Sequence, residues 1–277
     1  MRRTSVLCRR VFLILGIPLI ATMFPLQTIH AASDSLEQIQ AKKELRVGLD
    51  PGFFPFEMKT PQGEMVGFDI DMINAFAQSI GAKAKFIDTR WEGIIPALVA
   101  RKFDVIVSGM TITEERKKTL LFSEPYYQAG LVAMVSSKKK EKVKTAADLN
   151  HPTISIAVKV GTTGDIFASK AYPKARLRKL DSQSDCANAV ALGKVDAFIY
   201  DKPFLQLFAS KFSDKAFVLN EGLTVEEFGV AARKSDKKLI AAFNSFLKTW
   251  KENGGYAKSQ KIHFVEMPWA ASMPLFK

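Results

Sequence analysis

The chain has 277 residues, of which 47% are hydrophobic and 25% are charged. This composition is that of a globular protein and excludes collagen-like, coiled-coil and disordered classes. The length allows one large domain or two domains of about 100–150 residues. A formal net charge of +12 would suit a nucleic-acid or membrane-surface partner, so the origin of that charge has to be established first.

Residues 1–32 have the pattern of a secretory signal peptide. Four arginines and no acidic residue precede the apolar run 11–24, and Ala32 closes a small-residue exit. The run is short for a membrane span and contains Pro18, which leaves an uncleaved anchor as the weaker alternative. These arginines supply four of the net positive charges. After cleavage Cys186 has no partner cysteine, so we expect it to fill the core.

Apolar periodicity and turn residues predict an alternation of strands and helices in the rest of the chain. Strands are expected at 45–49, 83–87, 103–107, 154–158 and 195–200. Helices are expected at 68–80, at 91–102 with Pro96 as a weak point, after Thr113, after Thr162, at 184–192, after Pro203 and at 239–250. Such an alternation predicts parallel sheets in an α/β fold.

The lysine-rich stretch 136–144 is the clearest break in composition. We interpret it as a solvated surface excursion that follows an extended segment at 130–135. A nucleic-acid patch is the alternative, but aromatic residues for base stacking are not interleaved with the lysines. We therefore expect no nucleic-acid partner.

Polar residues gather where four of the predicted strands end. They are Asp50, the segment 108–111, Lys159 with the segment 161–163, and Asp201. Ligands of open parallel sheets bind outside the carboxyl ends of the strands. Because two of these ends come from each half of the chain, we expect two lobes that face each other across a cleft suited to a small zwitterion.

The chemistry of these groups fits such a ligand. Arg116 can hold a carboxylate with two hydrogen bonds, or it is simply an exposed helix arginine. Gly109 lets a ligand approach the backbone, or it only makes a tight turn. Thr162 and Thr163 open a helix, where unpaired N–H groups favour an anion. Asp201 can pair with an ammonium group or cap the helix that follows it.

Several motifs in chain order resemble the family 3 solute-binding proteins, the periplasmic receptors of ABC importers for polar amino acids. The motifs are VGLD at 47–50, PFE at 55–57, GFDID at 67–71, WEGIIPAL at 91–98, SGMTITEER at 108–116, FSEPYY at 122–127, VKVGTT at 158–163 and GKVDA at 193–197. Together they extend the resemblance over residues 45–256, nearly the whole chain after the leader.

The resemblance implies a type II periplasmic-binding-protein fold that closes on its ligand. Lobe one would comprise 33–134 plus 229–277, and lobe two would comprise 135–228. Residues 130–135 and 228–232 would be the two hinge crossings. It also implies a periplasmic monomer whose partners are an amino acid and the membrane permease of an ABC transporter.

Roles for the main-chain groups of the ligand follow from the same motifs. The resemblance assigns the α-carboxylate to Arg116, Thr111 and a backbone N–H of Thr163. It assigns the α-ammonium to Asp201, the carbonyl of Gly109 and Thr111.

The side chain of the ligand would lie among four further residues. Phe53 and Trp91 would flank its aliphatic part, and either could instead belong to the core, Trp91 more plausibly. Asp50 alone fits a basic amino acid, but Lys159 beside it adds a second cation. A donor next to an acceptor suits an amide, so glutamine is the expected ligand and arginine, lysine or histidine the alternative.

An enzyme is the rival from another class. Some proteins of this fold are cyclohexadienyl or arogenate dehydratases, for which Glu57 or Glu92 could serve as the acid. A fused lytic transglycosylase is excluded because the chain has no room for that domain. The amino-acid site is complete without either glutamate, so we expect a binding protein and not an enzyme. Without a Cys/His cluster in the sequence, we expect neither a metal nor a cofactor.

Overall fold

The computed structural model describes residues 35–273. The predicted signal peptide at 1–32 lies outside the described residues. The described residues group into one compact unit. In the described part of the chain, no helix is both long and apolar enough to cross a membrane.

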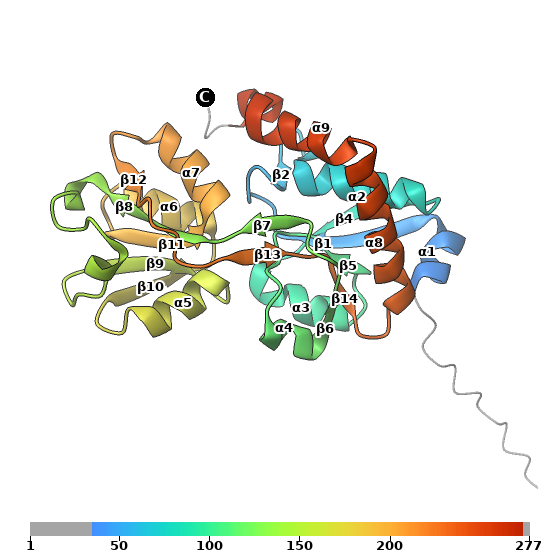
Figure 1. Cartoon of the computed structure of the whole chain (residues 1–277), viewed down its shortest axis with the longest axis horizontal. Coiled ribbons are helices and arrows are strands. Elements are labelled where there is room, and N and C mark those ends of the chain that lie inside the picture. Colours follow the sequence, from blue (N-terminus) through green and yellow to red (C-terminus); the bar gives the residue numbers. More distant parts are fainter. Residues whose placement is uncertain (1–34, 274–277) are drawn as a thin grey trace, which may run out of the picture. The chain divides into compact units, whose positions relative to one another are not determined.

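The first of two five-stranded sheets forms lobe one, with strand order β4-β1-β5-β14-β6 (Figure 1). Its strands are β1 (Glu44–Leu49), β4 (Lys83–Asp88), β5 (Val105–Ile106), β6 (Leu120–Phe122) and β14 (Ala231–Arg233). The helices of this lobe are α1 (Ser35–Lys42), α2 (Phe68–Ser79), α3 (Trp91–Val99), α4 (Glu114–Thr119), α8 (Lys237–Glu252) and α9 (Gly255–Lys261), followed by η3 (Ile262–Glu266) and η4 (Pro268–Ser272). A hairpin of β2 (Met58–Lys59) and β3 (Met65–Val66) lies between β1 and α2 in the sequence.

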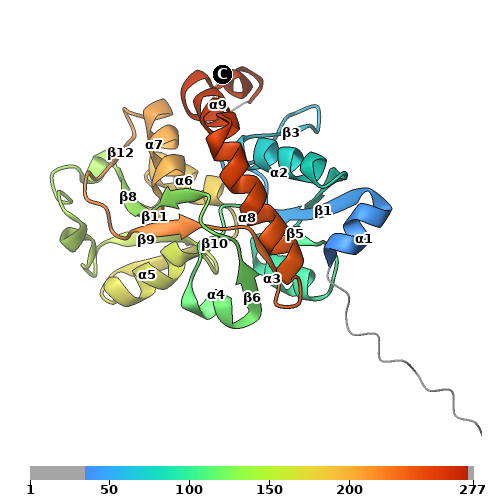
Figure 2. The same ribbon diagram turned by 45° about the vertical axis from the view of Figure 1, so that its right-hand side comes forward.

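The second five-stranded sheet forms lobe two, with strand order β10-β9-β11-β8-β12 (Figure 2). Its strands are β8 (Leu131–Ser136), β9 (Ser155–Lys159), β10 (Arg176–Leu180), β11 (Ala197–Asp201) and β12 (Ala216–Val218). Its helices are η1 (Ser137–Lys139), η2 (Ala146–Leu149), α5 (Thr163–Ala171), α6 (Gln183–Ala191) and α7 (Lys202–Lys211).

Both faces of each sheet are covered, as the continuous apolar runs of the strands require. In lobe two, Ile156 and Val158 of β9 pack with Ala168 of α5, whereas Ala157 between them joins the core that contains α6 and α7. In lobe one, α3 covers one face and α2 with α8 covers the other. Cys186 of α6 is fully buried in the core that contains α6 and α7, which confirms the expectation that it fills the core.

The α/β class is confirmed, but the expectation of parallel sheets is wrong in part. In lobe one, β1 pairs in parallel with β4 and β5, yet β14 runs antiparallel to both β5 and β6. In lobe two, β8 runs antiparallel to β11 and β12. The reason is that β8 and β14 directly follow the strands β7 (Tyr127–Ala129) and β13 (Glu226–Phe228), which pass between the lobes. The chain therefore enters each five-stranded sheet from the side of the other lobe, and this direction is opposite to that of the parallel strands in the sheet.

A two-stranded antiparallel sheet of β7 and β13 joins the lobes along the chain. Figure 1 shows it between the two larger sheets. Of the segments expected as crossings, 130–135 lies almost entirely in β8, while 228–232 runs from the last residue of β13 into β14. The crossing pair therefore lies two to three residues N-terminal to the expected positions.

Aromatic side chains connect the lobes beside this pair of strands. Phe53 and Phe54 follow β1, and both stack on Phe204 of α7, with ring centroids 6.1 and 4.3 Å away. Phe53 also meets Tyr200 of β11 edge to face at 5.7 Å. One apolar core consequently runs from lobe one into lobe two.

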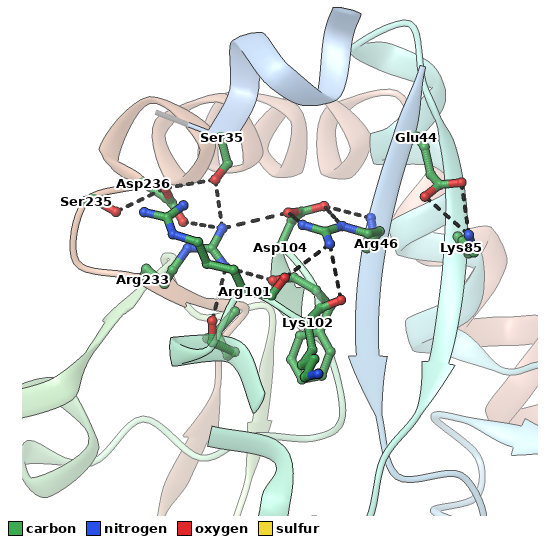
Figure 3. A network of polar contacts seen from close by, with 12 residues as sticks. Ser35, Glu44, Arg46, Lys85, Arg101, Lys102, Asp104, Arg233, Ser235 and Asp236 are labelled. Atoms are coloured by element: carbon green, nitrogen blue, oxygen red, sulfur yellow. Dashed lines mark hydrogen bonds and ion pairs between the residues drawn. The ribbon is translucent and has the colours of Figure 1, made fainter. Parts of the chain in front are cut away.

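A buried ionic network closes lobe one near the amino end of β1 (Figure 3). Arg233 of β14 pairs with Asp236 at 2.8 Å and donates to the hydroxyl of Ser35 at 2.7 Å. Arg46 of β1 pairs with Asp104 at 2.6 Å, and Asp104 lies 3.8 Å from Arg233. The network therefore connects α1, the sheet and the start of α8.

Replacing Asp236 tests whether this network stabilises lobe one. Asp236 is fully buried, so Asp236→Asn leaves the Arg233 guanidinium without its nearest counter-charge. We expect the free energy of unfolding in urea to fall by about 3 kcal/mol. Glu37→Gln is the control, because its partner Lys238 is exposed and the pair should contribute less than about 1 kcal/mol. Equal effects of the two substitutions would contradict the structural role.

Candidate functional site

One pocket gathers all nine residues that the sequence predicted for the site. Its lining includes Asp50, Phe53, Trp91, Gly109, Thr111, Arg116, Lys159, Thr163 and Asp201, together with Glu57, Ser108, Thr162 and Tyr200. These residues lie at the carboxyl ends of β1, β5, β9 and β11, in the loops that follow these strands, or in the first turn of the helices α3, α4 and α5. The strand-end rule for open α/β sheets therefore accounts for the location.

The pocket is almost closed by its own side chains. The cavity left between them measures about 10 Å³, which is about the space that one water molecule requires. An amino acid can enter only if the lobes separate first. A larger cavity of about 560 Å³ lies beside β7 and α7, but Lys202 is the one charged side chain among the described residues that line it.

An ion pair crosses the pocket from one lobe to the other. The Nζ of Lys159 in β9 lies 2.5 Å from Oδ2 of Asp50, which follows β1. It also donates to Oε1 of Gln183 at 2.6 Å. The Lys159 side chain is 2% exposed, whereas Asp50 is 19% exposed. Lys159 is thus held inside the pocket and does not extend to solvent.

Trp91, the first residue of α3, lies between the two cations of the site. Its ring centroid is 5.3 Å from Cζ of Arg116 and 5.5 Å from Nζ of Lys159. Its indole N–H donates to the carbonyl of Gly161 in lobe two at 3.2 Å. The face of an indole attracts cations, so this residue favours positive groups in the pocket.

Of the two aromatic residues expected beside the ligand, Phe53 and not Trp91 belongs to the core. Phe53 is 4% exposed and lies in the aromatic cluster, while Trp91 is half-buried. The prediction that Trp91 was the more plausible core residue is therefore wrong. The sequence suggested it because Phe53 lies in a loop rich in Pro and Gly, yet that loop packs on Phe204 of lobe two.

The backbone at Gly109 accepts no other residue. Its φ is +52°, and a Cβ there would come within 2.3 Å of the Phe53 ring. Its N–H donates to Oδ2 of Asp69 at 3.2 Å. The glycine therefore serves both a left-handed turn and a close approach of chain segments.

Arg116 lies on α4 and points back to the turn before that helix. Its Nη1 donates to the carbonyl of Thr111 at 2.8 Å, and its backbone N–H donates to the capping hydroxyl of Thr113. Burial lowers the pKa of Arg116, and the nearby carboxylates of Asp201 and Glu226 oppose that shift. The guanidinium remains charged and is available to a carboxylate.

Asp201 is a buried carboxyl group that no protein cation neutralises by direct contact in the described structure. It precedes α7, but its side chain makes no capping bond to that helix. No hydrogen bond within the described residues reaches its buried Oδ1. Burial, and next the charge of Glu226, raise the pKa of Asp201 to about 8, although Arg116 opposes this. A carboxyl group in this state is a ready acceptor for an ammonium group.

Glu57 of the pocket lining and Asp69, which lies next to it, form a pair of buried carboxyl groups. The hydroxyl of Ser108 donates to Glu57 at 2.6 Å and accepts the N–H of Asp50 at 3.0 Å. Asp69 accepts from the Tyr126 hydroxyl at 2.8 Å. Burial raises the pKa of Asp69 to about 7 and that of Glu57 well above its usual range, and each carboxyl affects the other. The pair holds the loops after β1 and β5 in place.

Two polar residues of the site were missed by the sequence analysis. Gln183 begins α6 just after β10, so the strand-end rule would have found it had β10 been recognised. Glu226 belongs to β13 and accepts hydrogen bonds from the hydroxyls of Thr111 and Thr163, both at 2.9 Å. Because β13 joins the lobes and is not a strand of either five-stranded sheet, the strand-end rule could not have identified Glu226.

Comparisons with known proteins agree with this geometry. Residues 45–274 match the family described as bacterial extracellular solute-binding proteins, family 3. An L-arginine-binding protein of Pseudomonas aeruginosa is 32% identical over 83% of this chain and 91% of its own length.

Two solved structures extend the comparison. A putative binding component of an ABC transporter from Wolinella succinogenes, complexed with lysine, has a TM-score of 0.79 at 37% identity and covers 83% of this chain and 99% of its own. An ancestral amino acid-binding protein, described as a precursor of cyclohexadienyl dehydratase, has a TM-score of 0.79 at 38% identity and covers 84% of this chain and 100% of its own.

Asp201 should make the stability of the ligand-free protein depend on pH. Because its pKa is raised to about 8 from 3.8, the folded protein holds this proton more tightly than the unfolded chain does. Its contribution to the free energy of unfolding is therefore complete below about pH 4 and is lost as the pH rises through about 8. Asp201→Asn should consequently be more stable than the unsubstituted protein at pH 8, by about 2–4 kcal/mol, and nearly equal to it at acid pH.

Urea unfolding at several pH values measures this difference. Asp214→Asn is the matched control, because Asp214 is exposed. A stability difference between Asp201→Asn and the unsubstituted protein that does not grow with pH would contradict the assignment.

Proposed function

The chain belongs to the bacterial extracellular solute-binding proteins of family 3, and from this premise we propose that it is a periplasmic receptor for a basic L-amino acid, arginine first. It captures the amino acid by closure of its lobes and delivers it to the membrane permease of an ABC transporter. We propose that it acts as a monomer, and we move the lobe boundaries, expected at 33–134 plus 229–277 and at 135–228, to the connecting strands: lobe two begins with β8 at Leu131 and ends before β13.

The observation that carries the proposal is the buried Oδ1 of Asp201, which has no hydrogen-bond partner among the described residues and lies in the same pocket as Arg116. A free α-amino acid presents an ammonium and a carboxylate one carbon apart, and each needs a partner of opposite charge once it is removed from water. Asp201 supplies the acceptor, and Arg116 supplies a donor that can bind a carboxylate with two hydrogen bonds. Gly109, Thr111 and Thr163 line the space around them.

The balance of charge in the pocket supports a basic side chain. Asp50 and Glu226 balance the two cations Arg116 and Lys159. Two further carboxyl groups, Glu57 and Asp201, line the pocket with pKa values raised by burial, so that a cation has to approach before they ionise fully. A ligand with a net positive charge offsets this excess of carboxyl groups, whereas a neutral amino acid does not. Relatives that bind arginine, and a neighbour complexed with lysine, support the same choice.

Glutamine, the ligand expected from the sequence, is not supported by these relatives. That expectation rested on repulsion between Lys159 and a cationic ligand. The charge of Lys159 is already matched by Asp50, and its Nζ also donates to the amide oxygen of Gln183. Its Nζ contacts Oδ2 of Asp50, which leaves Oδ1 of that carboxylate for the tip of a basic side chain.

Closure of the lobes provides the mechanism of capture. Groups from both lobes contact the ligand, so the ligand stabilises the closed form over the open form by the difference in its affinity for the two. The two lobes also contact each other directly, through the Lys159–Asp50 pair and the bond from Trp91 to Gly161. The ligand therefore adds to a set of contacts that the lobes make by themselves.

We propose that the protein is not an enzyme. Glu57, the acid considered for a dehydratase, is fully buried and its carboxyl is engaged by Ser108 and Asp69. Glu92, the other acid considered, lies 3.8 Å from the exposed Arg90. Turnover of prephenate or arogenate by the purified protein would overturn this part of the proposal.

Removing the guanidinium of Arg116 should weaken every amino acid ligand. Arg116→Ala deletes the partner of the α-carboxylate, and the loss of a buried charged hydrogen bond should cost at least about 2 kcal/mol, or about 30-fold in Kd. Calorimetric titration with arginine, lysine, histidine and glutamine measures the effect. Lys117→Ala is the control, because Lys117 is the next residue of α4 and is exposed. A loss confined to one of the four ligands would show that Arg116 does not bind the α-carboxylate.

Removing the ammonium of Lys159 should instead change the order of the ligands. Lys159→Met frees the whole Asp50 carboxylate for a cationic tip, so the ratio of arginine to glutamine affinity should rise by about tenfold. Lys170→Met, at an exposed lysine of α5, should leave the ratio unchanged. Tighter binding of glutamine than of arginine by the unsubstituted protein would overturn the choice of a basic ligand.

A further inference from the structure

Glu226 brings a carboxylate to the ligand pocket from the strand pair that joins the lobes. It is the first residue of β13 and lies opposite Ala129 of β7. Its backbone therefore belongs to neither of the five-stranded sheets, while its side chain reaches groups that belong to each lobe. No role in the site was expected for it from the sequence.

The contacts of this carboxylate are three hydroxyl groups. Its Oε2 accepts from Oγ1 of Thr111 and from Oγ1 of Thr163, both at 2.9 Å. Its Oε1 accepts from Oγ1 of Thr224 at 3.0 Å. Thr111 follows β5 of lobe one, and Thr163 begins α5 of lobe two. A single oxygen atom thus connects the two lobes through two threonines of the pocket.

These bonds determine what the threonines can offer to a ligand. An ionised carboxylate accepts hydrogen bonds and donates none, and a hydroxyl has one proton and two lone pairs. With its proton committed to Glu226, the hydroxyl of Thr111 presents lone pairs to the pocket. It can accept from an ammonium N–H, but it cannot donate to a carboxylate. The hydroxyl of Thr111 is therefore suited to the ammonium side of an amino acid.

The charge of Glu226 acts on the same side of the pocket. It is the second cause, after burial, of the raised pKa of Asp201, and it opposes the lowering of the pKa of Arg116. Both effects agree with a position of the Glu226 carboxylate close to Asp201 and Arg116, the residues proposed to bind the ammonium and the carboxylate of the ligand. A cation held between Asp201 and Thr111 is stabilised by two negative charges instead of one.

We infer that Glu226 is a positioning and specificity-determining residue for the α-ammonium group of the ligand. It fixes the hydroxyl of Thr111 as a hydrogen-bond acceptor and adds a negative charge beside Asp201. Because its Oε2 also holds Thr163, it achieves this arrangement only when the lobes are together. The inference rests on the proposed function, since it assigns a role within the amino-acid site.

The test compares arginine with its 2-hydroxy analogue, in which a hydroxyl replaces the α-ammonium. The unsubstituted protein should bind arginine at least about 100-fold more tightly, because an unpaired Asp201 and an acceptor-only Thr111 both disfavour the hydroxyl. In Glu226→Gln the amide can donate to Thr111 and free its proton for the ligand, so this ratio should fall about tenfold or more. A merely structural role would weaken both ligands equally and leave the ratio unchanged, which would overturn the inference.

Two further variants complete the experiment. Glu227→Gln is the matched control, because Glu227 is the next residue of the same strand and is exposed; it should leave the ratio as it is. Thr111→Val removes the hydroxyl that Glu226 orients, so it should reproduce the fall in the ratio, and the double variant should add little to it. Additive effects of the two substitutions would overturn the inference, even where Glu226→Gln alone folds poorly.

The same titrations separate this inference from the proposed function. If the unsubstituted protein binds neither arginine nor any other amino acid, the proposed function is wrong and the inference falls with it. If it binds arginine and the ratio of arginine to the hydroxy analogue is the same in Glu226→Gln, the receptor function stands and the role of Glu226 is wrong.

Discussion

Ionisable groups buried between two lobes must find partners of opposite charge, and the rest of the site follows from how this chain meets that requirement. Lys159 is 2% exposed, and its charge is matched by Asp50 from the other lobe. Asp201 is 7% exposed, but no protein group within the described residues bonds to its Oδ1. A buried carboxyl without a partner is costly. The proposed ligand would remove that cost by bringing an ammonium group to Asp201.

The same constraint connects binding with stability and motion. An acid kept partly protonated by burial makes the ligand-free closed form less stable as the pH rises, which is the kind of strain that functional sites retain at the expense of the fold. The aromatic contact of Phe54 with Phe204, at 4.3 Å, lies beside the strands β7 and β13 and joins the two cores. The lobes thus share an apolar contact near the connecting strands and a charged contact in the pocket. A ligand that strengthens the charged contact shifts the balance between open and closed forms.

The sequence predicted the α/β class and the pocket residues because both depend on local pattern. Alternation of apolar residues marks the strands, and polar residues after them mark the carboxyl edge of each sheet, so Asp50, Lys159 and Asp201 could be found without a structure. Contacts between segments that are distant in the sequence could not be predicted in this way. The packing of Phe53 against Phe204, the antiparallel entry of β8 and β14, and the reach of Glu226 from β13 to Thr111 and Thr163 depend on how the lobes meet. The expectation of glutamine depended on a contact of the same kind, because the pairing of Lys159 with Asp50 and Gln183 decides whether its charge repels a cation.

The central claim is that Asp201 and the excess of carboxyl groups in the pocket require a ligand with a free α-ammonium and a cationic side chain. Mass spectrometry of the small molecules released when the purified protein is denatured, with no ligand added beforehand, tests this claim most directly. The account predicts stoichiometric arginine, or lysine or histidine in its place, from the unsubstituted protein, and none of them from Asp201→Asn. Release of a neutral amino acid, or of a compound without an ammonium group, would contradict it.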